Sequence, residues 1–404
     1  MSWAKRICGA VVDEFLCLFV IFPLAIFHWR GTWHLQDVYV LPNNYVASNW
    51  VSASVGSTFS VILMLLHPSV TKWLISKPRW VYAFGIRLYL YLSAWAILGY
   101  WRGFWDLIDY YLTEEWMNSL ILYVIAEVLS LLLRTSRTNA GLPMSLQVDR
   151  DEDLLKPDTR YAAKTSSSCC KYFLDALFTQ FVVVTLNIIV WRGLWNMMDT
   201  FIYPEDKLIS DLASLILGYS TCILLFLMEY PASKASARLD DYHIFYKLAF
   251  EGLLTVIGTW SILLLWRGAW NLVKTYVIPD KRVGGIVCHV IGVIGLMFLQ
   301  GYSNVGTNGI DIDGSYEDGK GIYPTEYLRY FLSRDSPHKV KYSELQALSG
   351  DMTDGSLQKL SMSNYDADSE SSSSDLEECM PVDLQEKELL KQKLLNGHPN
   401  GSHV

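Results

Sequence analysis

Charged residues are scarce in this 404-residue sequence: they make up 18% of the chain, against 51% hydrophobic residues. They are also unevenly placed, because long apolar runs fill the first 301 residues and the last hundred are rich in Ser, Asp and Glu. The formal net charge of −8 argues against a nucleic-acid-binding protein. The apolar runs indicate a membrane protein instead.

The sequence also lacks the arrangements on which most enzymes and metalloproteins depend. Its seven cysteines have neither the paired spacing of a metal site nor that of a disulfide framework. No phosphate-binding glycine loop and no nucleophile–base arrangement is present. We therefore expect a protein that is not an enzyme and that needs no cofactor or metal.

One motif, Trp-Arg-Gly-x-Trp, is present four times. Its first Trp, Arg and last Trp are Trp29, Arg30 and Trp33; Trp101, Arg102 and Trp105; Trp191, Arg192 and Trp195; and Trp266, Arg267 and Trp270. The flanks match as well, since eight residues after the first Trp stand Asp37, Asp109, Asp199 and, in the fourth copy, Lys274. Four copies with matching flanks mark an internal repeat.

Eight apolar segments are long enough to cross a bilayer, which takes roughly 20 residues. They lie at about 8–28, 47–66, 81–100, 115–133, 172–190, 208–228, 247–265 and 284–301. Each motif directly follows an odd-numbered segment, so the predicted repeat is helix, motif, short polar stretch, helix. The sequence thus predicts an all-α integral membrane protein of eight transmembrane helices, built from four tandem two-helix repeats in two pseudo-symmetric halves.

The distribution of Lys and Arg predicts the orientation. These residues are concentrated before the first segment and after each even-numbered one, which places both termini in the cytoplasm and the motifs on the outer side. The predicted division is 1–133 for helices 1–4, 134–171 for a cytoplasmic loop, 172–301 for helices 5–8, 302–335 for a juxtamembrane segment and 336–404 for a disordered tail. Small residues on the even-numbered helices favour close helix packing.

Two interpretations of the motif remain open. In the first, Trp and Arg anchor the helix ends at the headgroup level, and in three repeats the Asp seven residues after the Arg returns as its partner, whereas Lys274 breaks the pair in the fourth. In the second, the four arginines form a ring at an outer vestibule that attracts anions.

Acidic residues recur at one depth, 15 or 16 residues before the first Trp of three motifs. They are Glu14, Asp175 and Glu251, and Arg87 stands close to the corresponding place in the remaining helix. An ion-paired layer inside the bundle is one interpretation. Side chains that extend to the interface are the other.

The predicted cytoplasmic parts carry signals of modification and binding. Cys8, Cys169 and Cys170 lie next to apolar segments, where cysteines are candidates for palmitoylation or are free thiols. Serines stand upstream of acidic residues at 369–378, which suits an acid-directed kinase. At the end of the chain, Ser402 and the Val404 carboxylate match the pattern that PDZ domains bind.

The four motifs on an eight-segment chain, with Trp-Arg-Gly-Leu-Trp-Asn-Met-Met-Asp at 191–199, resemble the Fuseless family of multipass membrane proteins. The resemblance covers about residues 1–335. It implies a neuronal, presynaptic plasma-membrane protein that is required for synaptic transmission and that places voltage-gated calcium channels at active zones. It implies no catalytic or binding residues.

Two classes of function follow. The resemblance and the PDZ-type ending favour an organiser whose partners are membrane lipids, voltage-gated calcium channel complexes and a PDZ-domain scaffold. The repeat, the four arginines and the acidic layer favour an ion channel or transporter. Against transport, Pro23 has no counterpart in the other odd-numbered segments, so no matched pair of broken helices marks a binding site.

Overall fold

The computed structural model describes residues 3–112, 115–146, 148–149, 159–161, 169–306, 309–316, 319, 323 and 327, without the side chains of residues 3–8 and 10. The regular structure of these residues is helical. The α-helices are α1 (Trp3–Leu16), α2 (Phe22–Tyr39), α3 (Tyr45–Ile75), α4 (Arg79–Tyr111), α5 (Trp116–Leu132), α6 (Cys169–Phe178), α7 (Val184–Phe201), α8 (Lys207–Leu239), α9 (Ile244–Leu272) and α10 (Lys281–Phe298). π-Helical turns η1 (Cys17–Ile21) and η3 (Thr179–Val183) join α1 to α2 and α6 to α7, and η4 (Val273–Val277) extends α9.

Three of these helices begin at an acidic or amide side chain that the sequence places before an apolar run. Asn44 accepts a hydrogen bond from the Ala47 amide at the start of α3, and Asp206 and Asp280 do the same at the starts of α8 and α10. Such caps satisfy amides that have no partner within the helix. The polar stretch after each motif therefore ends where the next helix begins.

Seven helices of the described part are long and apolar enough to cross a membrane. They are Val11–Tyr39, Tyr45–Ile75, Arg79–Tyr111, Cys169–Phe201, Lys207–Leu239, Ile244–Val277 and Lys281–Phe298. Together they include seven of the eight predicted segments, and the remaining segment, 115–133, coincides with the shorter apolar helix α5. The all-helical class with several helices long and apolar enough to cross a membrane is confirmed, whereas the eighth span, the four two-helix repeats and the orientation stay predictions.

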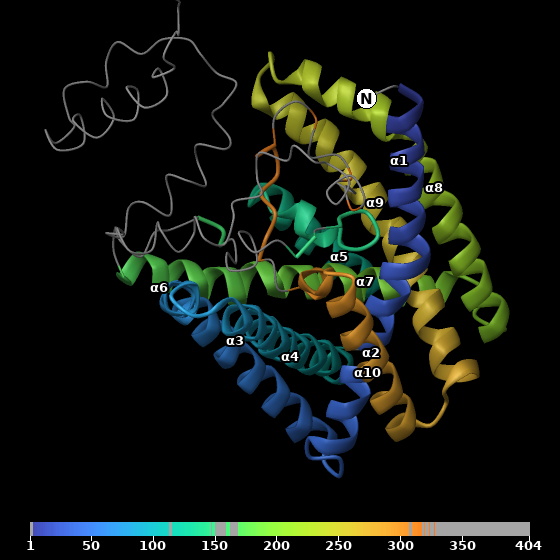
Figure 1. The fold of residues 1–404 in the computed structure, drawn as a ribbon. Coiled ribbons are helices and arrows are strands. Elements are labelled where there is room, and N and C mark those ends of the chain that lie inside the picture. Colours follow the sequence, from blue (N-terminus) through green and yellow to red (C-terminus); the bar gives the residue numbers. More distant parts are fainter. Residues whose placement is uncertain are drawn as a thin grey trace, which may run out of the picture. The chain divides into compact units, whose positions relative to one another are not determined.

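The helices pack in four pairs within the described residues: α4 with α3, α7 with α5, α9 with α8, and α2 with α10 (Figure 1). One helix of each pair carries the motif. These four motif helices also contact one another in the closed order α2, α4, α7, α9. The result is an inner ring of motif helices with one partner helix outside each. The first and last helices of the bundle, α2 and α10, are thus neighbours.

Glycine explains why the paired helices lie so close. A Cβ atom on the motif glycine of any pair would come within 3.0 Å of the backbone of the partner helix (Gly31, Gly103, Gly193 and Gly268). Glycines on three partner helices, Gly56, Gly218 and Gly292, meet the motif helices in the same way. The small residues predicted to favour close packing thus do so, and the motif glycine serves helix contact rather than a turn.

The segment that follows α5 is part of the core. Residues 134–171 were predicted to be a cytoplasmic loop, yet Leu142, Met144 and Leu146 are buried. Tyr302 and Val305, which follow α10, are buried as well. Residues of both segments are therefore part of the core of the bundle. The predicted tail, 336–404, lies outside the described residues.

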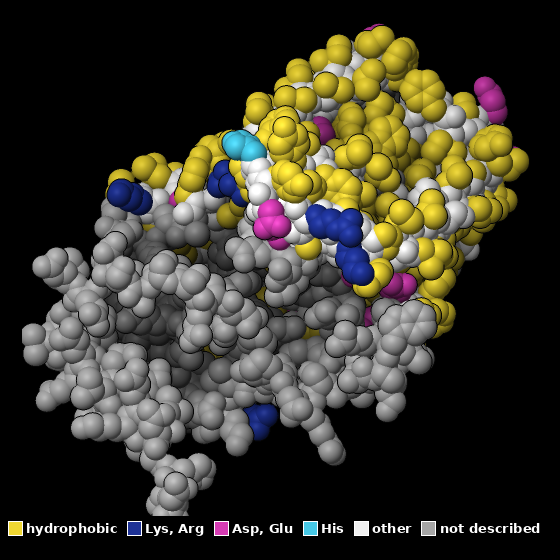
Figure 2. Space-filling view, turned by 90° about the horizontal axis from the view of Figure 1, so that it is seen from above, with side chains coloured by type: hydrophobic (Ala, Val, Ile, Leu, Met, Phe, Trp, Pro, Cys, Tyr) yellow, Lys and Arg dark blue, Asp and Glu magenta, His cyan; other side chains and the backbone are white. Residues whose placement is uncertain are grey.

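The outer surface of the described helices is mostly apolar. Figure 2 shows hydrophobic side chains over most of the coloured surface, with charged groups gathered in a few places. Large side chains such as Leu227, Phe298 and Ile216 are exposed. An apolar exterior of this kind suits contact with lipid.

Candidate functional site

The four motifs lie inside helices. The sequence had predicted that each motif directly follows a helix, and this placement is corrected here. Trp29 and Trp33 belong to α2, and the corresponding residues belong to α4, α7 and α9. Residues four apart share one face of a helix, so the two Trp side chains of a motif stand one turn apart on the same face. In each motif helix that face points to the centre of the bundle. The interpretation of these tryptophans as anchors in the headgroup layer is therefore wrong.

The first Trp of each motif contributes to a closed ring. Trp29, Trp101, Trp191 and Trp266 contact one another edge to face in that order, with ring-centre distances of 5.2, 5.6 and 5.5 Å, and Trp266 returns to Trp29 at 5.9 Å. Edge-to-face contact places the positive edge of one indole on the negative face of the next. Each motif helix is thereby joined to both of its neighbours.

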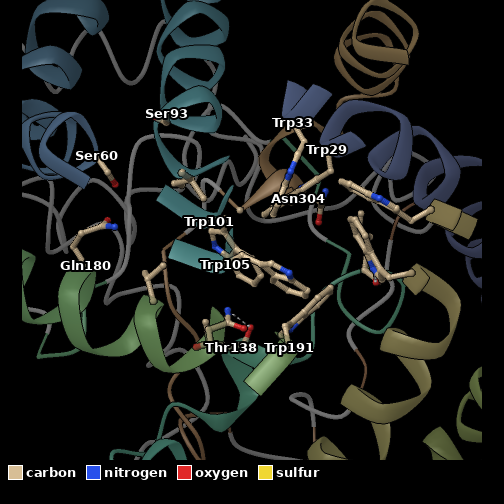
Figure 3. Close-up of a pocket in the computed structure, with 18 of the residues that line it drawn as sticks. Trp29, Trp33, Ser60, Ser93, Trp101, Trp105, Thr138, Gln180, Trp191 and Asn304 are labelled. Atoms are coloured by element: carbon tan, nitrogen blue, oxygen red, sulfur yellow. Dashed lines mark hydrogen bonds between the residues drawn. The ribbon is translucent and has the colours of Figure 1, made fainter. Parts of the chain in front are cut away.

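The last Trp of each motif forms a second ring one turn further along. Trp33, Trp105, Trp195 and Trp270 meet edge to face at 6.2, 5.7 and 6.4 Å, and Trp270 returns to Trp33 at 5.7 Å. Figure 3 shows Trp29, Trp33, Trp101, Trp105 and Trp191 converging on one space. The arrangement is approximately fourfold, although one chain supplies all eight side chains.

The motif arginines are buried, and three of them bind an Asp of the preceding motif. The Nε of Arg102 lies 2.7 Å from Asp37, and the Nε of Arg267 lies 2.7 Å from Asp199. Arg192 pairs with Asp109 in the same manner. The prediction that each Asp returns to the Arg of its own motif is therefore wrong. The three ion pairs link successive repeats.

Hydroxyl groups of the partner helix bind all three of these arginines, one at Arg192, where Ser119 accepts at 3.3 Å, and two at each of the other sites. Arg102 donates to Ser52 at 2.7 Å and to Ser48 at 2.9 Å. Arg267 donates to Ser214 at 2.6 Å and to Ser210 at 2.7 Å. A buried ion pair stabilises a fold only when its remaining hydrogen bonds are satisfied, and these sites meet that condition.

Arg30 differs from the other motif arginines. Its side chain is fully buried, and it donates to the Ile278 carbonyl at 3.0 Å and to the Cys288 sulfur at 3.4 Å. No carboxylate of the described residues pairs with it, because Lys274 stands at the position that the other repeats give to Asp. The hypothesis of a ring of four arginines that attracts anions at an outer vestibule is thus wrong, since all four are buried and three of them are already paired.

A cavity of about 390 Å³ lies along the axis of the bundle. All eight motif tryptophans line it, together with polar side chains from several elements. Three lining residues have a buried polar atom that lacks a hydrogen-bond partner within the described residues: His34 Nδ1, Gln180 Nε2 and Asn187 Oδ1. A cavity with aromatic walls and a few convergent polar groups is typical of a small-molecule site.

One of the π-helical turns lies at this cavity. η3 begins twelve residues before Trp191 and supplies Thr179 and Gln180 to the lining. η1 begins twelve residues before Trp29. Such turns interrupt regular helices and are frequent at functional sites.

The segment after α5 contacts the first Trp ring. Trp191 donates to the Asn139 carbonyl at 3.1 Å, and Trp266 donates to the Leu142 carbonyl at 2.9 Å. Asn139 in turn donates to the Glu127 carboxylate at 3.0 Å. The first motif tryptophans of α7 and α9 therefore hold the segment after α5 inside the bundle through these two hydrogen bonds.

Asp313 fixes the same segment from the other side. It accepts hydrogen bonds from the Ser136 amide at 3.1 Å and from the Arg137 amide at 2.8 Å. Burial raises the pKa of Asp313 to about 6, although these amides and the charges of Arg137 and Arg134 favour its ionised form. The Asp313 carboxyl group is thus one of several hydrogen-bonding groups that join the segments after α5 and α10, and Arg134, for example, donates to the Asp313 carbonyl at 3.0 Å.

The predicted charged layer has local partners. Asp175 accepts hydrogen bonds from the Thr159 hydroxyl and the Tyr161 amide, and Glu251 accepts one from Ser236. Arg87 is exposed and donates to a carbonyl of its own helix, and Glu14 is partly exposed. None of the four belongs to the cavity lining. The ion-paired layer of these four residues inside the bundle therefore stays a prediction.

The remaining predicted positions lie at the margins of the described part. Cys169 and Cys170 are exposed free cysteines, and the Cys8 side chain lies outside the described residues, as do Ser402 and Val404. No group of three or more His, Cys, Asp or Glu residues within the described ranges has the arrangement of a metal site.

Several residues of the site have a spacing in the sequence that already places them on one face of a helix. The spacing of four between the two Trp residues already placed them on one helix face. Ser48 and Ser52 are likewise four apart, as are Ser210 and Ser214. By contrast, Gln180 and Asn187 carried no signal, because only the fold brings them to the axis.

Comparison with known proteins gives one match. The model of the Fuseless family matches residues 9–305, which include all four motifs and the helices of both rings. No curated protein matches the chain, and no solved structure does.

Proposed function

Since the chain belongs to the Fuseless family, we propose that it is a presynaptic plasma-membrane protein that organises voltage-gated calcium channels at active zones. The observation that carries the proposal is the closure of the inner ring. Two Trp rings join the four motif helices, three ion pairs link successive repeats, and α2 packs on α10. A bundle in which each motif helix is joined to both neighbouring motif helices suits a rigid organiser better than a transporter, because a transporter must change its conformation.

The proposed topology has eight spans with both termini in the cytoplasm. α5, the shortest candidate, has 17 residues. That corresponds to roughly 26 Å of helix, near the lower limit for crossing a bilayer. With eight spans, the exposed cysteines at the start of α6 lie at the cytoplasmic face, where palmitoylation takes place, and the Ser402–Val404 ending is available to a PDZ-domain scaffold. The proposed role involves no catalysis.

The test is a replacement experiment in neurons that lack the protein. Calcium channel density at active zones and evoked release are measured after expression of the full chain or of a chain without residues 402–404. The proposal expects both quantities to fall in the absence of the protein and to recover with the full chain. The shortened chain should reach the membrane but fail to cluster. Unchanged channel density in neurons without the protein would refute the organiser role.

A second candidate, an ion channel or transporter, is favoured by the axial cavity and its polar atoms without partners. Ion flux through the purified protein in liposomes separates the two candidates. The organiser proposal expects no flux above that of protein-free liposomes. Flux that Gln180→Leu lowers, with equal amounts of folded protein, would establish transport, because Gln180 lines the cavity.

A further inference from the structure

The pair formed by α2 and α10 departs from the pair formed by α4 and α3 at three positions around its arginine. Gly292 lies against His28 as Gly56 lies against Tyr100, and this register aligns α10 with α3. Cys288 and Gly284 consequently stand where α3 has Ser52 and Ser48. The third change is Lys274, which replaces the Asp of the other repeats. The same arginine is thus kept while its carboxylate and both hydroxyls are lost.

The consequence is a buried positive charge without a counter-charge from the described residues. Arg30 has its two hydrogen bonds to a carbonyl and a thiol, and its Nε has no partner. A buried ion costs several kcal/mol unless it is paired, as a general rule. Sequence changes that remove all three partners at one site are therefore unfavourable unless an anion is present there.

Two further cations lie at this place. Lys274 and Lys281 line the cavity together with His34, and both act electrostatically on His34, as does Arg30. No ion pair joins either lysine to a described residue. His34 is itself 4% exposed, and its Nδ1 has no hydrogen-bond partner.

The acidic groups nearby are already engaged. Asp37 also lines the cavity, but it is bound to Arg102 at 2.7 Å. Asp280 precedes Lys281 and caps α10 through the Val283 amide at 2.7 Å. The part of the cavity lined by Lys274, Lys281 and His34 is called the motif end below. It therefore carries net positive charge, and it adjoins the indoles of Trp33 and Trp270, whose ring centres are 5.7 Å apart.

We infer that the motif end of the cavity binds a small organic anion whose carboxylate lies among Lys274, Lys281 and His34. The buried charge of Arg30 lies behind these groups and adds to the attraction. The indoles of Trp33 and Trp270 provide an apolar wall for the body of the ligand, which an inorganic ion would not need. The cavity volume of about 390 Å³ lies within the range of small-molecule sites.

The first test is ligand-dependent stability of the purified full chain in detergent. The unfolding temperature is followed through tryptophan fluorescence during titration with benzoate, with neutral benzamide of the same shape, and with benzylammonium. A ligand that binds only the folded protein raises this temperature with concentration. The inference expects a rise with benzoate alone. An equal rise with benzamide, or none with benzoate, would overturn it.

Variants locate the site. Lys274→Asp places a carboxylate where three other repeats have one, so the protein should fold, and the benzoate affinity should fall at least tenfold. Lys281→Gln should lower it severalfold. Lys207→Asp is the matched control, because it makes the same charge change at the start of α8 in a residue that does not line the cavity; its affinity should stay within twofold of the unchanged protein. Unchanged affinity in both cavity variants contradicts the inference.

The carboxylate has two possible sources, a soluble metabolite or the headgroup of an anionic lipid. Benzoate titration in nanodiscs of phosphatidylcholine, with and without phosphatidylserine, separates them. Competition by phosphatidylserine supports the site and identifies a headgroup as the occupant. Benzoate binding that phosphatidylserine leaves unchanged supports the site and identifies a soluble anion.

Discussion

In three helix pairs the motif arginine binds a carboxylate of the preceding motif helix, and in the fourth pair, α2 with α10, it binds none of the described carboxylates. All four pairs nevertheless share the same glycine contact between backbones, from Gly31 on α2 to Gly268 on α9. The fourth pair also joins the two ends of the bundle without a connecting loop. The comparison shows that close helix packing is present in all four pairs and does not depend on the ion pair. In the pair of α2 and α10 the ion pair is absent, and Lys274 lines the cavity instead.

The largest effect is expected when a paired site is given the residue of the unpaired one. Asp37→Lys places a cation beside Arg102, whose hydroxyl partners Ser48 and Ser52 hold it in place. Removing one partner of a buried ion pair costs about 3–5 kcal/mol, so the free energy of unfolding should fall by at least about 3 kcal/mol. Unfolding in detergent by a denaturant measures it.

Its control is Glu205→Lys, the same charge change at an exposed residue before α8. A surface change of this kind should stay within about 0.5 kcal/mol. If Asp37→Lys were as mild as its control, the paired and unpaired sites would not differ as described.

The glycine contact should be worth the same in both kinds of pair. Gly31→Ala and Gly103→Ala each force a Cβ against the backbone of the partner helix, which should cost about 1–3 kcal/mol in either case. Gly99→Ala is the control on α4, because its nearest neighbour would be the Ser52 carbonyl at an ordinary 3.4 Å. Thermal unfolding of the three variants compares them. A cost at Gly103 without one at Gly31 would mean that α2 and α10 are not packed like the other pairs.

A smaller difference in the free energy of unfolding is expected between substitutions of the first motif Trp in the two halves of the chain. Trp191→Phe removes the hydrogen bond to the Asn139 carbonyl, whereas Trp29 makes no such bond within the described residues. Trp191→Phe should therefore cost about 1 kcal/mol more than Trp29→Phe. Unfolding of both variants gives the difference. Equal costs would show that the segment after α5 is not held by the ring.

The smallest effect is expected when the unpaired site is given its carboxylate. Lys274→Asp offers Arg30 a counter-charge, but position 274 is exposed and lies in the π-helical turn η4, so the gain in stability should be at most about 1 kcal/mol. The unfolding midpoint measures it against Lys207→Asp. A loss greater than that of the control would show that Arg30 does not need a carboxylate.

Much of the fold was predictable because apolar runs and polar interruptions alternate along the first 301 residues. All eight predicted segments coincide with helices, and the small residues of the even-numbered segments mark close contacts. The segment after α5 was not predictable in this way. Its polar composition indicated a loop outside the bundle, whereas a few apolar residues, Leu142 and Met144 among them, place it inside.

The partners of the arginines were not predictable from one repeat. Within a continuous helix, seven residues separate an Arg from its own Asp by roughly 10.5 Å, and the Arg side chain points the other way, toward the start of the helix. Only the arrangement of neighbouring helices brings Asp37 to Arg102. Depth along the helix alone was also insufficient to predict which acidic residues are buried. Adjacent residues of a helix point about 100° apart, so Asp13 is buried whereas its neighbour Glu14, the residue of the predicted layer, is partly exposed.

A double-mutant cycle tests the central claim most directly, namely that the ion pairs link successive repeats. The free energy of unfolding is measured for Asp37→Asn, Asp109→Asn and Arg102→Met, and for Arg102→Met combined with each of the others. The structure predicts a coupling of at least about 1 kcal/mol between Asp37 and Arg102, and less than about 0.5 kcal/mol between Arg102 and Asp109 of its own repeat. Coupling of Arg102 to Asp109 instead would contradict the closed ring of linked repeats.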